Sequence, residues 1–286
     1  MRSDFVACIL THGRADNVKT LKTLEKHGYT GDIILVVDDE DEQGPEYESR
    51  YGDMVHRFCK QDYIDSARTM CPSSDVKRGV ILYARNAAID IAREAGYKWL
   101  IELDDDYTNF EHRDAKGRKT ISTPVKDLDA VFEAMVNFVE KTGVATLAMA
   151  QGGEDFVGGA TGSHSILGSG ERWRRKAMNS FVLPTDTELR FRGSVNEDVV
   201  TYLEESQRGN VLLTCCHVNL TQTQTQSNKG GMTGEYKDDG TWCKSMFAVI
   251  AAPSCCTLGK MGNTKNRMHH KIDWNSAAPK IVRETV

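Results

Sequence analysis

Residues 80–106 read VILYARNAAIDIAREAGYKWLIELDDD, and this stretch decides the fold more directly than any other part of the chain. After a short apolar run and an Ala-Arg-Asn segment, a helix is predicted because Ala87, Ile91 and Ala95 recur at i, i+4 and i+8 on one face. Lys98 to Leu103 is a short, largely apolar run, typical of a buried strand. A helix that leads into a buried strand indicates an α/β protein with a central sheet.

The predicted strand runs into three consecutive aspartates, Asp104, Asp105 and Asp106. Open α/β sheets place their ligands at the carboxyl ends of the strands. Adjacent carboxylates repel one another unless a cation or several hydrogen-bond donors compensate them, and Asp104 and Asp106 project to the same side of an extended chain. A divalent-metal site is therefore favoured, with a solvated acidic turn as the alternative.

The first hundred residues alternate predicted strands and helices. Phe5 to Leu10 and Ile33 to Val37 are strand-like, and Val18 to His27 has helical spacing. This β-α-β order predicts a parallel sheet with ligands at the strand tips. A polar loop is the alternative for the acidic run at 38–41, and residues 40–79 are polar without a long period. Further helices are predicted at 64–70, 127–141 and 199–207, and further strands at 144–150 and 211–220.

Composition narrows the class of protein. The chain has 286 residues, is 40% hydrophobic and 27% charged, and carries a net charge of −5. This balance indicates a globular protein and argues against tight nonspecific binding of nucleic acid. No apolar run approaches the roughly 18 residues that span a bilayer, and the N-terminus is predicted to be a first strand, not a signal peptide. The eight cysteines lack CxxC spacing, and we expect reduced thiols in a cytoplasmic protein.

A second carboxylate centre, Asn196-Glu197-Asp198, directly precedes the helix predicted from Val199 to Gln207. Carboxylates at a helix start commonly serve as caps, so capping and catalysis are both open for these residues. The seven glycines between 152 and 170 fit neither GxxxxGK[ST] nor GxGxxG, which argues against an NTPase or a dinucleotide-binding protein. The basic stretch around Trp173 indicates either a solvated turn or a contact to a polyanion or a diphosphate.

The segment ARNxAIxxA, followed by an apolar strand and Asp-x-Asp, resembles the nucleotide-sugar half of A-type-fold glycosyltransferases. The resemblance implies a Rossmann-like α/β fold with a mostly parallel central sheet flanked by helices. It implies one domain over 1–286, with a nucleotide-sugar half at 1–110 and an elaborated acceptor and catalytic half at 111–286.

The same resemblance implies roles for individual residues. Mn²⁺ or Mg²⁺ is expected on Asp104 and Asp106, with His217 as a third ligand and His269 and His270 behind it as candidates. An inverting enzyme of this family carries its general base at the position of Asp198, and Glu197 would orient the acceptor or a neighbouring loop. Asp105 is expected to be the most sugar-facing aspartate, and Arg85 to hold the donor diphosphate. The expected donor-binding residues are Thr11, Arg14, Asp38, Asp39, Arg85, Asn86, Asp104 and Asp105.

The arrangement NSFV…FRGxxNEDVVTYL, with the tail that follows it, resembles phage glycosyltransferases associated with TET-type hydroxylases. That resemblance implies transfer of a sugar, with UDP-glucose as the expected donor, to 5-hydroxymethylcytosine in DNA within an infected bacterial cytoplasm. It implies no membrane and no obligate protein partner. A glycosyltransferase acting on a glycan, a protein or a small molecule remains an alternative, as does a nucleotidyltransferase or a nucleotide-binding module. The expected DNA contacts are Trp173, Arg174, Arg175, Lys229, Arg267 and His270.

Overall fold

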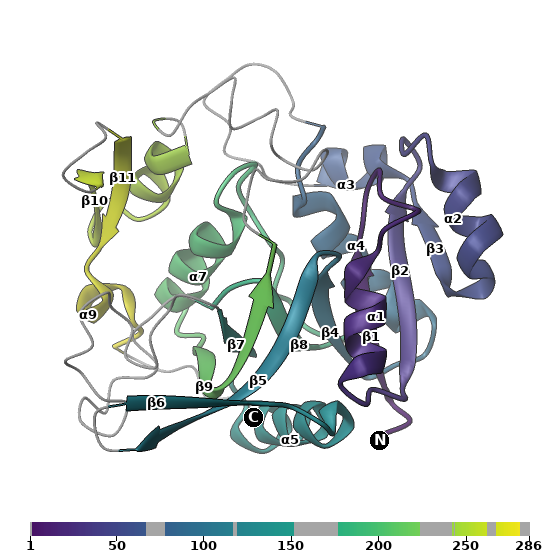
Figure 1. Ribbon diagram of the computed structural model, residues 1–286. Helices are drawn as coiled ribbons and strands as arrows, with labels where there is room; N and C mark the ends of the chain where they lie inside the picture. The colour runs from purple at the N-terminus through teal and green to yellow at the C-terminus, as the bar shows by residue number, and fades with distance from the viewer. Residues whose placement is uncertain are drawn as a thin grey trace.

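The computed structural model describes residues 2–66, 78–116, 119–151, 177–223, 242, 244–261 and 267–280. Its centre is a nine-stranded sheet in the order β3-β2-β1-β4-β8-β7-β9-β5-β6, with helices on both faces (Figure 1). The predicted α/β fold class is confirmed. The boundary expected at residue 110 falls inside β5 (Tyr107–Lys116), so the two halves share a strand.

One half of the sheet is parallel. β1 (Phe5–Leu10) pairs in parallel with β2 (Asp32–Asp38) on one side and with β4 (Trp99–Asp104) on the other, and β2 pairs with β3 (Val55–Phe58). The predicted strands at 5–10, 33–37 and 98–103 are confirmed to within a residue or so. Helices α1 (Lys19–Lys26) and α4 (Leu82–Glu94) are the crossovers between these strands. All four strand tips therefore meet at one edge of the sheet.

The other half is mixed. β8 (Ser180–Pro184) runs antiparallel to both β4 and β7 (Thr146–Gln151), whereas β7 and β9 (Leu212–Gln222) are parallel. β5 and β6 (Lys119–Pro124) form an antiparallel pair at the sheet edge. The predicted strands at 144–150 and 211–220 are confirmed, but β5, β6 and β8 were not predicted. β5 and β6 were missed because their sequences, YTNFEHRDAK and KTISTP, lack a continuous apolar pattern.

Each face of the sheet has its own core. Alternate β1 residues supply the two sides, with Val6, Cys8 and Leu10 in one core and Phe5, Ala7 and Ile9 in the other. The first core contains α4 and α7 (Glu197–Gln207), and the second contains α1 and α5 (Leu128–Thr142). The predicted helix at 127–141 begins one residue later, because Asp127 is its N-cap and accepts a hydrogen bond from the Ala130 backbone N–H at 3.0 Å.

The predicted polar segment at 40–79 contains ordered elements that the sequence pattern did not reveal. They are α2 (Gly44–Tyr51), the short helix η1 (Gly52–Met54), β3 and α3 (Lys60–Ser66). The helix expected at 64–70 thus starts earlier, at Lys60. Among the described helices, none combines the length and the apolar character that a membrane span requires.

The C-terminal part packs beside α7. β10 (Cys256–Met261) and β11 (Arg267–Ile272) form a separate antiparallel pair, followed by the short helix α9 (Trp274–Ala277). Figure 1 shows these elements on the side of the molecule away from β2 and β3. The Trp274 ring meets the Tyr202 ring of α7 edge-on, with 5.3 Å between ring centroids. The C-terminal part is therefore anchored to the helix that follows the second carboxylate centre.

Replacing Gly28 by alanine should destabilise the protein more than the same change at Gly96. Both glycines have positive φ (78° and 88°), which costs an alanine about 1–2 kcal/mol. A Cβ at Gly28 would also lie 2.5 Å from the Lys126 carbonyl oxygen, whereas a Cβ at Gly96 meets nothing within 4 Å. Urea unfolding of Gly28→Ala and Gly96→Ala measures the difference. Equal losses would show that the contact between the end of α1 and the start of α5 relaxes freely.

Candidate active site

Thr20 of α1 holds the acidic turn at the end of β4 in place, through its side chain and its backbone. Thr20 Oγ1 donates to the Asp104 carbonyl at 2.6 Å, and the Thr20 N–H donates to the Asp105 carbonyl at 3.1 Å. The Tyr107 N–H donates back to Thr20 Oγ1 at 3.0 Å. The Asp106 carbonyl accepts from the Thr223 N–H at 3.1 Å, just beyond the end of β9. The turn is thus fixed from two sides, which sets the directions of its three carboxylates.

The middle carboxylate points back into the protein. Asp105 is 5% exposed, accepts a hydrogen bond from Thr11 Oγ1 at 2.8 Å, and forms an ion pair with Arg14. The sequence predicted that Asp105 would be the most sugar-facing of the three aspartates, and the structure corrects this prediction. Asp104 and Asp106, on either side of Asp105 in the chain, are only half-buried.

A single buried arginine connects the acidic turn to the second carboxylate centre. The Arg85 guanidinium lies 3.3 Å from Asp104 Oδ1, 3.3 Å from Glu197 Oε1 and 3.4 Å from Glu102 Oε2. Its side chain is 1% exposed. The ring centroids of Phe181 and Phe191 lie 5.3 and 5.5 Å from the guanidinium carbon and 4.9 Å from each other, so both rings pack against the same side of the guanidinium.

Negative charge exceeds positive charge around this arginine. Burial alone would lower the pKa of Arg85, but the charges of Asp104, Glu197 and Glu102 outweigh burial and raise it, so Arg85 stays cationic. Burial raises the pKa of Glu102 to about 8, against the opposing effect of Arg85. Burial likewise raises the pKa of Asp104 to about 7, with Arg85 opposing and Asp106 reinforcing the rise. The cluster therefore holds more carboxylates than its own cation can neutralise.

Asn86, the next residue of the Ala-Arg-Asn segment, holds the chain that leads to the second centre. Its Nδ2 donates to the Phe191 carbonyl at 3.1 Å, and its Oδ1 accepts from the Phe191 N–H at 2.8 Å. The side chain is 7% exposed. The predicted donor-binding role of Asn86 stays a prediction, whereas these contacts give it a positioning role. The segment also lies inside α4, which begins at Leu82, and not before the helix as expected.

The second centre lies at the start of α7. Asn196 has a left-handed backbone with φ 59° and ψ 34°, and its side chain makes no capping bond to the helix. Glu197 is buried against Arg85, whereas Asp198 is half-buried and accepts a hydrogen bond at Oδ1 from the Val199 N–H at 2.8 Å. This bond to the start of the helix engages Oδ1 of the Asp198 carboxylate.

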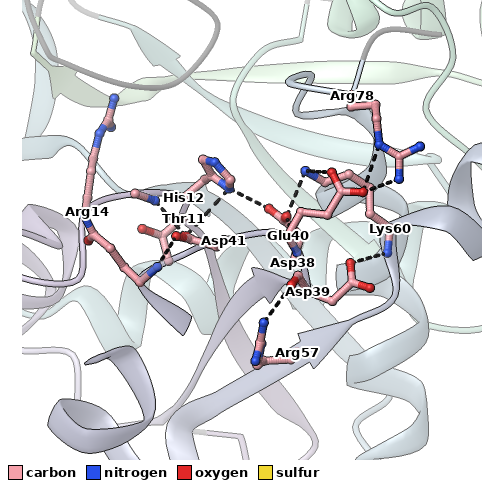
Figure 2. Close-up of polar contacts among 12 residues, drawn as sticks. Thr11, His12, Arg14, Asp38, Asp39, Glu40, Asp41, Arg57, Lys60 and Arg78 are labelled. Atoms are coloured by element: carbon pink, nitrogen blue, oxygen red, sulfur yellow. Dashed lines mark hydrogen bonds and ion pairs between the residues drawn. The ribbon is translucent and has the colours of Figure 1, made fainter. Parts of the chain in front are cut away.

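The tip of β2 is a network of charged side chains (Figure 2). Asp38 Oδ1 lies 2.8 Å from Lys60 Nζ, and Asp38 Oδ2 lies 2.7 Å from His12 Nδ1. Burial acts to raise the pKa of Asp38, but the bonds from His12 and Lys60 prevail and bring it to about 2. Asp39 Oδ1 accepts from the Lys60 N–H at 2.9 Å. Both predicted donor-binding carboxylates therefore have partners within the protein.

Two residues of this network were missed by the sequence reasoning. His12 stands between Asp38 and Asp41 and is 49% exposed on its side chain, and Lys60 is 7% exposed. Asp41 Oδ2 also accepts from the Gly13 N–H at 2.7 Å, which fixes the tip of β1. The place of His12 after the first strand was a signal for it. Nothing local in the sequence marks Lys60, since it meets Asp38 only through the fold.

The structure separates His217, the expected third metal ligand, from the acidic turn. His217 is exposed, and its Nδ1 lies 3.3 Å from the Arg113 carbonyl. It stands five residues before the end of β9 at Gln222, roughly 16 Å along the strand. His270 is 8% exposed and faces Asn196, not an open surface. Arg267 begins β11. The candidates Trp173, Arg174, Arg175 and Lys229 lie outside the described residues.

A divalent cation fits the chemistry of the outer aspartates. Within the described parts of the chain, no group of three or more His, Cys, Asp or Glu side chains is arranged to hold a metal ion. Asp104 and Asp106 nevertheless present two half-buried carboxylates beside an excess of negative charge. Mg²⁺ is usually held by one or two carboxylates together with phosphate oxygens of a substrate. These two residues would therefore hold the ion jointly with a bound diphosphate.

A parallel β-α-β half with carboxylates at its strand tips, joined to a second carboxylate turn at a helix start, agrees with the A-type fold of glycosyltransferases. The model of the family described as TET-Associated Glycosyltransferase matches residues 5–231, so the chain belongs to this family. No curated protein matches the chain.

Several solved glycosyltransferase structures are similar to the chain. TarS from S. aureus (residues 1–349) in complex with UDP-GlcNAc is 13% identical with a TM-score of 0.43, over 82% of this chain and 63% of that one. The mannosyltransferase PcManGT from Pyrobaculum calidifontis, in complex with GDP-Man and Mn²⁺, is 11% identical with a TM-score of 0.46, over 89% and 75%. The Mycobacterium tuberculosis glucosyl-3-phosphoglycerate synthase is 9% identical with a TM-score of 0.47, over 94% and 86%.

The chain spans 63% or less of the length of the TarS structures that it matches. Because these TM-scores lie below 0.5, the likeness by itself assigns no donor, metal or acceptor to this chain.

Replacing Arg85 by methionine should lower the free energy of unfolding by about 3–5 kcal/mol, because removal of one partner leaves buried carboxylates without a counter-ion. Arg93→Met on the same helix is the control, since the Arg93 side chain is 47% exposed and its loss should cost at most about 0.5 kcal/mol. Urea unfolding at neutral pH gives both values. A loss at Arg85 as small as that at Arg93 would show that the surrounding carboxylates become protonated at little cost.

Proposed function

We propose that this protein is a metal-dependent, inverting glycosyltransferase that moves a sugar from a UDP-sugar, most plausibly UDP-glucose, to 5-hydroxymethylcytosine in DNA. The observation that carries the proposal is the Arg85 cluster. One guanidinium contacts both Asp104 of the acidic turn and Glu197 of the second centre. A donor bound at the first centre would therefore lie beside the candidate base at the second.

The acidic turn is the proposed site for the donor diphosphate. Asp104 and Asp106 would hold a divalent ion, which would supply positive charge against the charge of the departing diphosphate. Arg85 is 1% exposed and engaged by three carboxylates, so its proposed role is to position Asp104 and Glu197 and not to contact the diphosphate. Arg14, 19% exposed on its side chain and paired with Asp105, is the better candidate for a direct contact.

Asp198 is the proposed general base. It would take the proton of the acceptor hydroxyl while the hydroxyl oxygen forms a bond to the anomeric carbon of the sugar. The bond from that carbon to the diphosphate oxygen breaks on the opposite side, and UDP leaves. Attack opposite the leaving group inverts the anomeric centre, so an α-linked donor gives a β-glycoside.

DNA as the acceptor is supported by the family and by the resemblance of the tail, which imply a hydroxymethylated pyrimidine as the target. In a DNA duplex, the target pyrimidine would leave the base stack to enter the active site, at a cost of a few kcal/mol. Trp173, Arg174, Arg175, Lys229 and Arg267 remain the proposed DNA contacts. His270 is withdrawn from this set, because its side chain is buried against Asn196.

The deciding experiment is incubation with a panel of UDP-sugars and DNA containing 5-hydroxymethylcytosine, followed by mass spectrometry of the released nucleosides. We expect the modified nucleoside to gain the mass of one hexose, in a reaction that requires Mn²⁺ or Mg²⁺. Hydrolysis of a UDP-sugar without any gain of mass on the DNA nucleosides would contradict the proposal that DNA is the acceptor. The proposal of a UDP-sugar donor would still stand. NMR of the anomeric proton in the product tests inversion.

Asp104→Asn and Asp106→Asn should each lose most Mn²⁺-dependent binding of UDP, because oxygen ligands for a divalent ion depend on carboxylate charge. Titration calorimetry with UDP, with and without Mn²⁺, measures the loss. Asp62→Asn, at an exposed carboxylate of α3, is the control and should bind as the unmodified protein does. Unchanged affinity in both turn variants would mean that the three aspartates form only an acidic turn.

Asp198→Asn should lower the rate of transfer by roughly 10²–10⁴-fold, the contribution typical of a general base, with little change in donor affinity. Stability should change by about 1 kcal/mol or less, since asparagine retains the size of aspartate and its tolerance of a helix start. Asp186→Asn, at an exposed turn residue after β8, is the matched control. Near-normal transfer by Asp198→Asn would remove Asp198 from the mechanism.

A further inference from the structure

The residue before the two catalytic candidates has an unusual backbone. Asn196 lies in the left-handed region at φ 59°, and Asn179 is the one other non-glycine residue of the described chain with positive φ. This conformation costs most L-residues about 1–2 kcal/mol, and asparagine tolerates it better than others. Such a backbone persists only where its surroundings hold it. The surroundings of Asn196 therefore determine the directions of Glu197 and Asp198.

The side chain of Asn196 is held by two groups from the C-terminal part. Its Nδ2 lies 3.1 Å from the Lys244 carbonyl oxygen and 3.0 Å from His270 Nδ1. A carbonyl oxygen can only accept, so the amide nitrogen must face it, and a flipped amide would set oxygen against oxygen. The second hydrogen of Nδ2 then goes to His270 Nδ1, which must carry no proton. The ring proton of a neutral His270 consequently lies on Nε2.

The same part of the chain also packs against the turn with apolar groups. Phe247, from the helical residues 244–251, forms a small buried cluster with Val195 and Val200 on either side of the second centre. Ser245 Oγ donates to the Met268 carbonyl at 3.2 Å, which ties these residues to β11. Lys244, His270 and Phe247 all lie beyond residue 231, where the family match ends.

From these contacts we infer that His270 is a positioning residue for the second carboxylate centre, which it holds through Asn196. The inference rests on the proposed function, since it takes Asp198 to be the base. Rotation of the peptide between Asn196 and Glu197 would redirect both carboxylates, and a displacement of about 1 Å in a catalytic group can cost roughly 10²-fold in rate. A buried histidine that only stabilises the fold would leave the rate of the chemical step unchanged.

Variants of the two partners test the inference. His270→Phe removes the acceptor, and we expect kcat to fall at least about 10-fold while the donor KM stays within about twofold. His270→Asn places an amide oxygen near the position of Nδ1, so it should recover most of the lost kcat. Asn196→Gly tolerates positive φ without strain but lacks the amide, and should match His270→Phe. Lys271→Met, at an exposed neighbouring position of β11, is the control.

A double variant gives a stricter test. If Asn196 and His270 act through the one hydrogen bond that joins them, Asn196→Gly combined with His270→Phe should be no slower than the slower single variant. If the fold-losses in kcat of the two single variants multiply in the double variant, the inference is overturned, because the two residues would then act separately. A fall in melting temperature with kcat unchanged in His270→Phe would overturn it too, since that pattern belongs to a purely structural histidine.

Hydrogen exchange separates this inference from the proposed function. The Val200 N–H donates to the Asn196 carbonyl at 2.9 Å, so its exchange reports on the turn whatever the reaction is. We expect faster exchange at Val200 in His270→Phe and unchanged exchange in Asp198→Asn. Failure of the function would show as normal transfer by Asp198→Asn, whereas failure of the positioning role would show as unchanged Val200 exchange in His270→Phe.

Discussion

The desolvated guanidinium of Arg85 is the interaction on which the arrangement of the site depends. A buried cation is costly unless it is paired and hydrogen-bonded, and here Glu102 and Asp104 of β4 and Glu197 of α7 supply the partners. Each of those carboxylates would in turn be costly without the arginine. The requirement for charge compensation thus forces β4, α4 and the start of α7 into one geometry, although Arg85 and Glu197 are 112 residues apart.

The same cluster gives a physical reason for a cation and a diphosphate to bind together. One arginine cannot neutralise the three carboxylates around it. Burial raises the pKa values of Asp104 and Glu102, and the neighbouring carboxylates add to the rise. A divalent ion on Asp104 and Asp106 would relieve that imbalance of charge, and its remaining coordination positions would be open to an anion with oxygen ligands. A diphosphate supplies that anion, so ion and donor are expected to favour each other's binding.

Local periodicity predicted those parts of the fold that have a one-sided or wholly apolar pattern, such as β1, β4 and α5. It could not predict β5 and β6, whose residues are polar and whose pairing depends on strands distant in the chain. The site shows the same division. The acidic turn and the Asn-Glu-Asp segment were found as local motifs, whereas the inward direction of Asp105, the bonds of Asn86 to Phe191 and the pairing of Lys60 with Asp38 arise from tertiary contacts alone.

The two carboxylate centres are held in place by different parts of the chain. The acidic turn is braced by short-range bonds from Thr20, and its elements belong to the parallel half of the sheet. The second centre carries a left-handed residue whose hydrogen-bond partners come from the C-terminal part, beyond the family match. On the proposed function, donor binding would depend on the parallel half of the sheet, whereas the direction of the candidate base would depend on the contacts of Asn196 with Lys244 and His270.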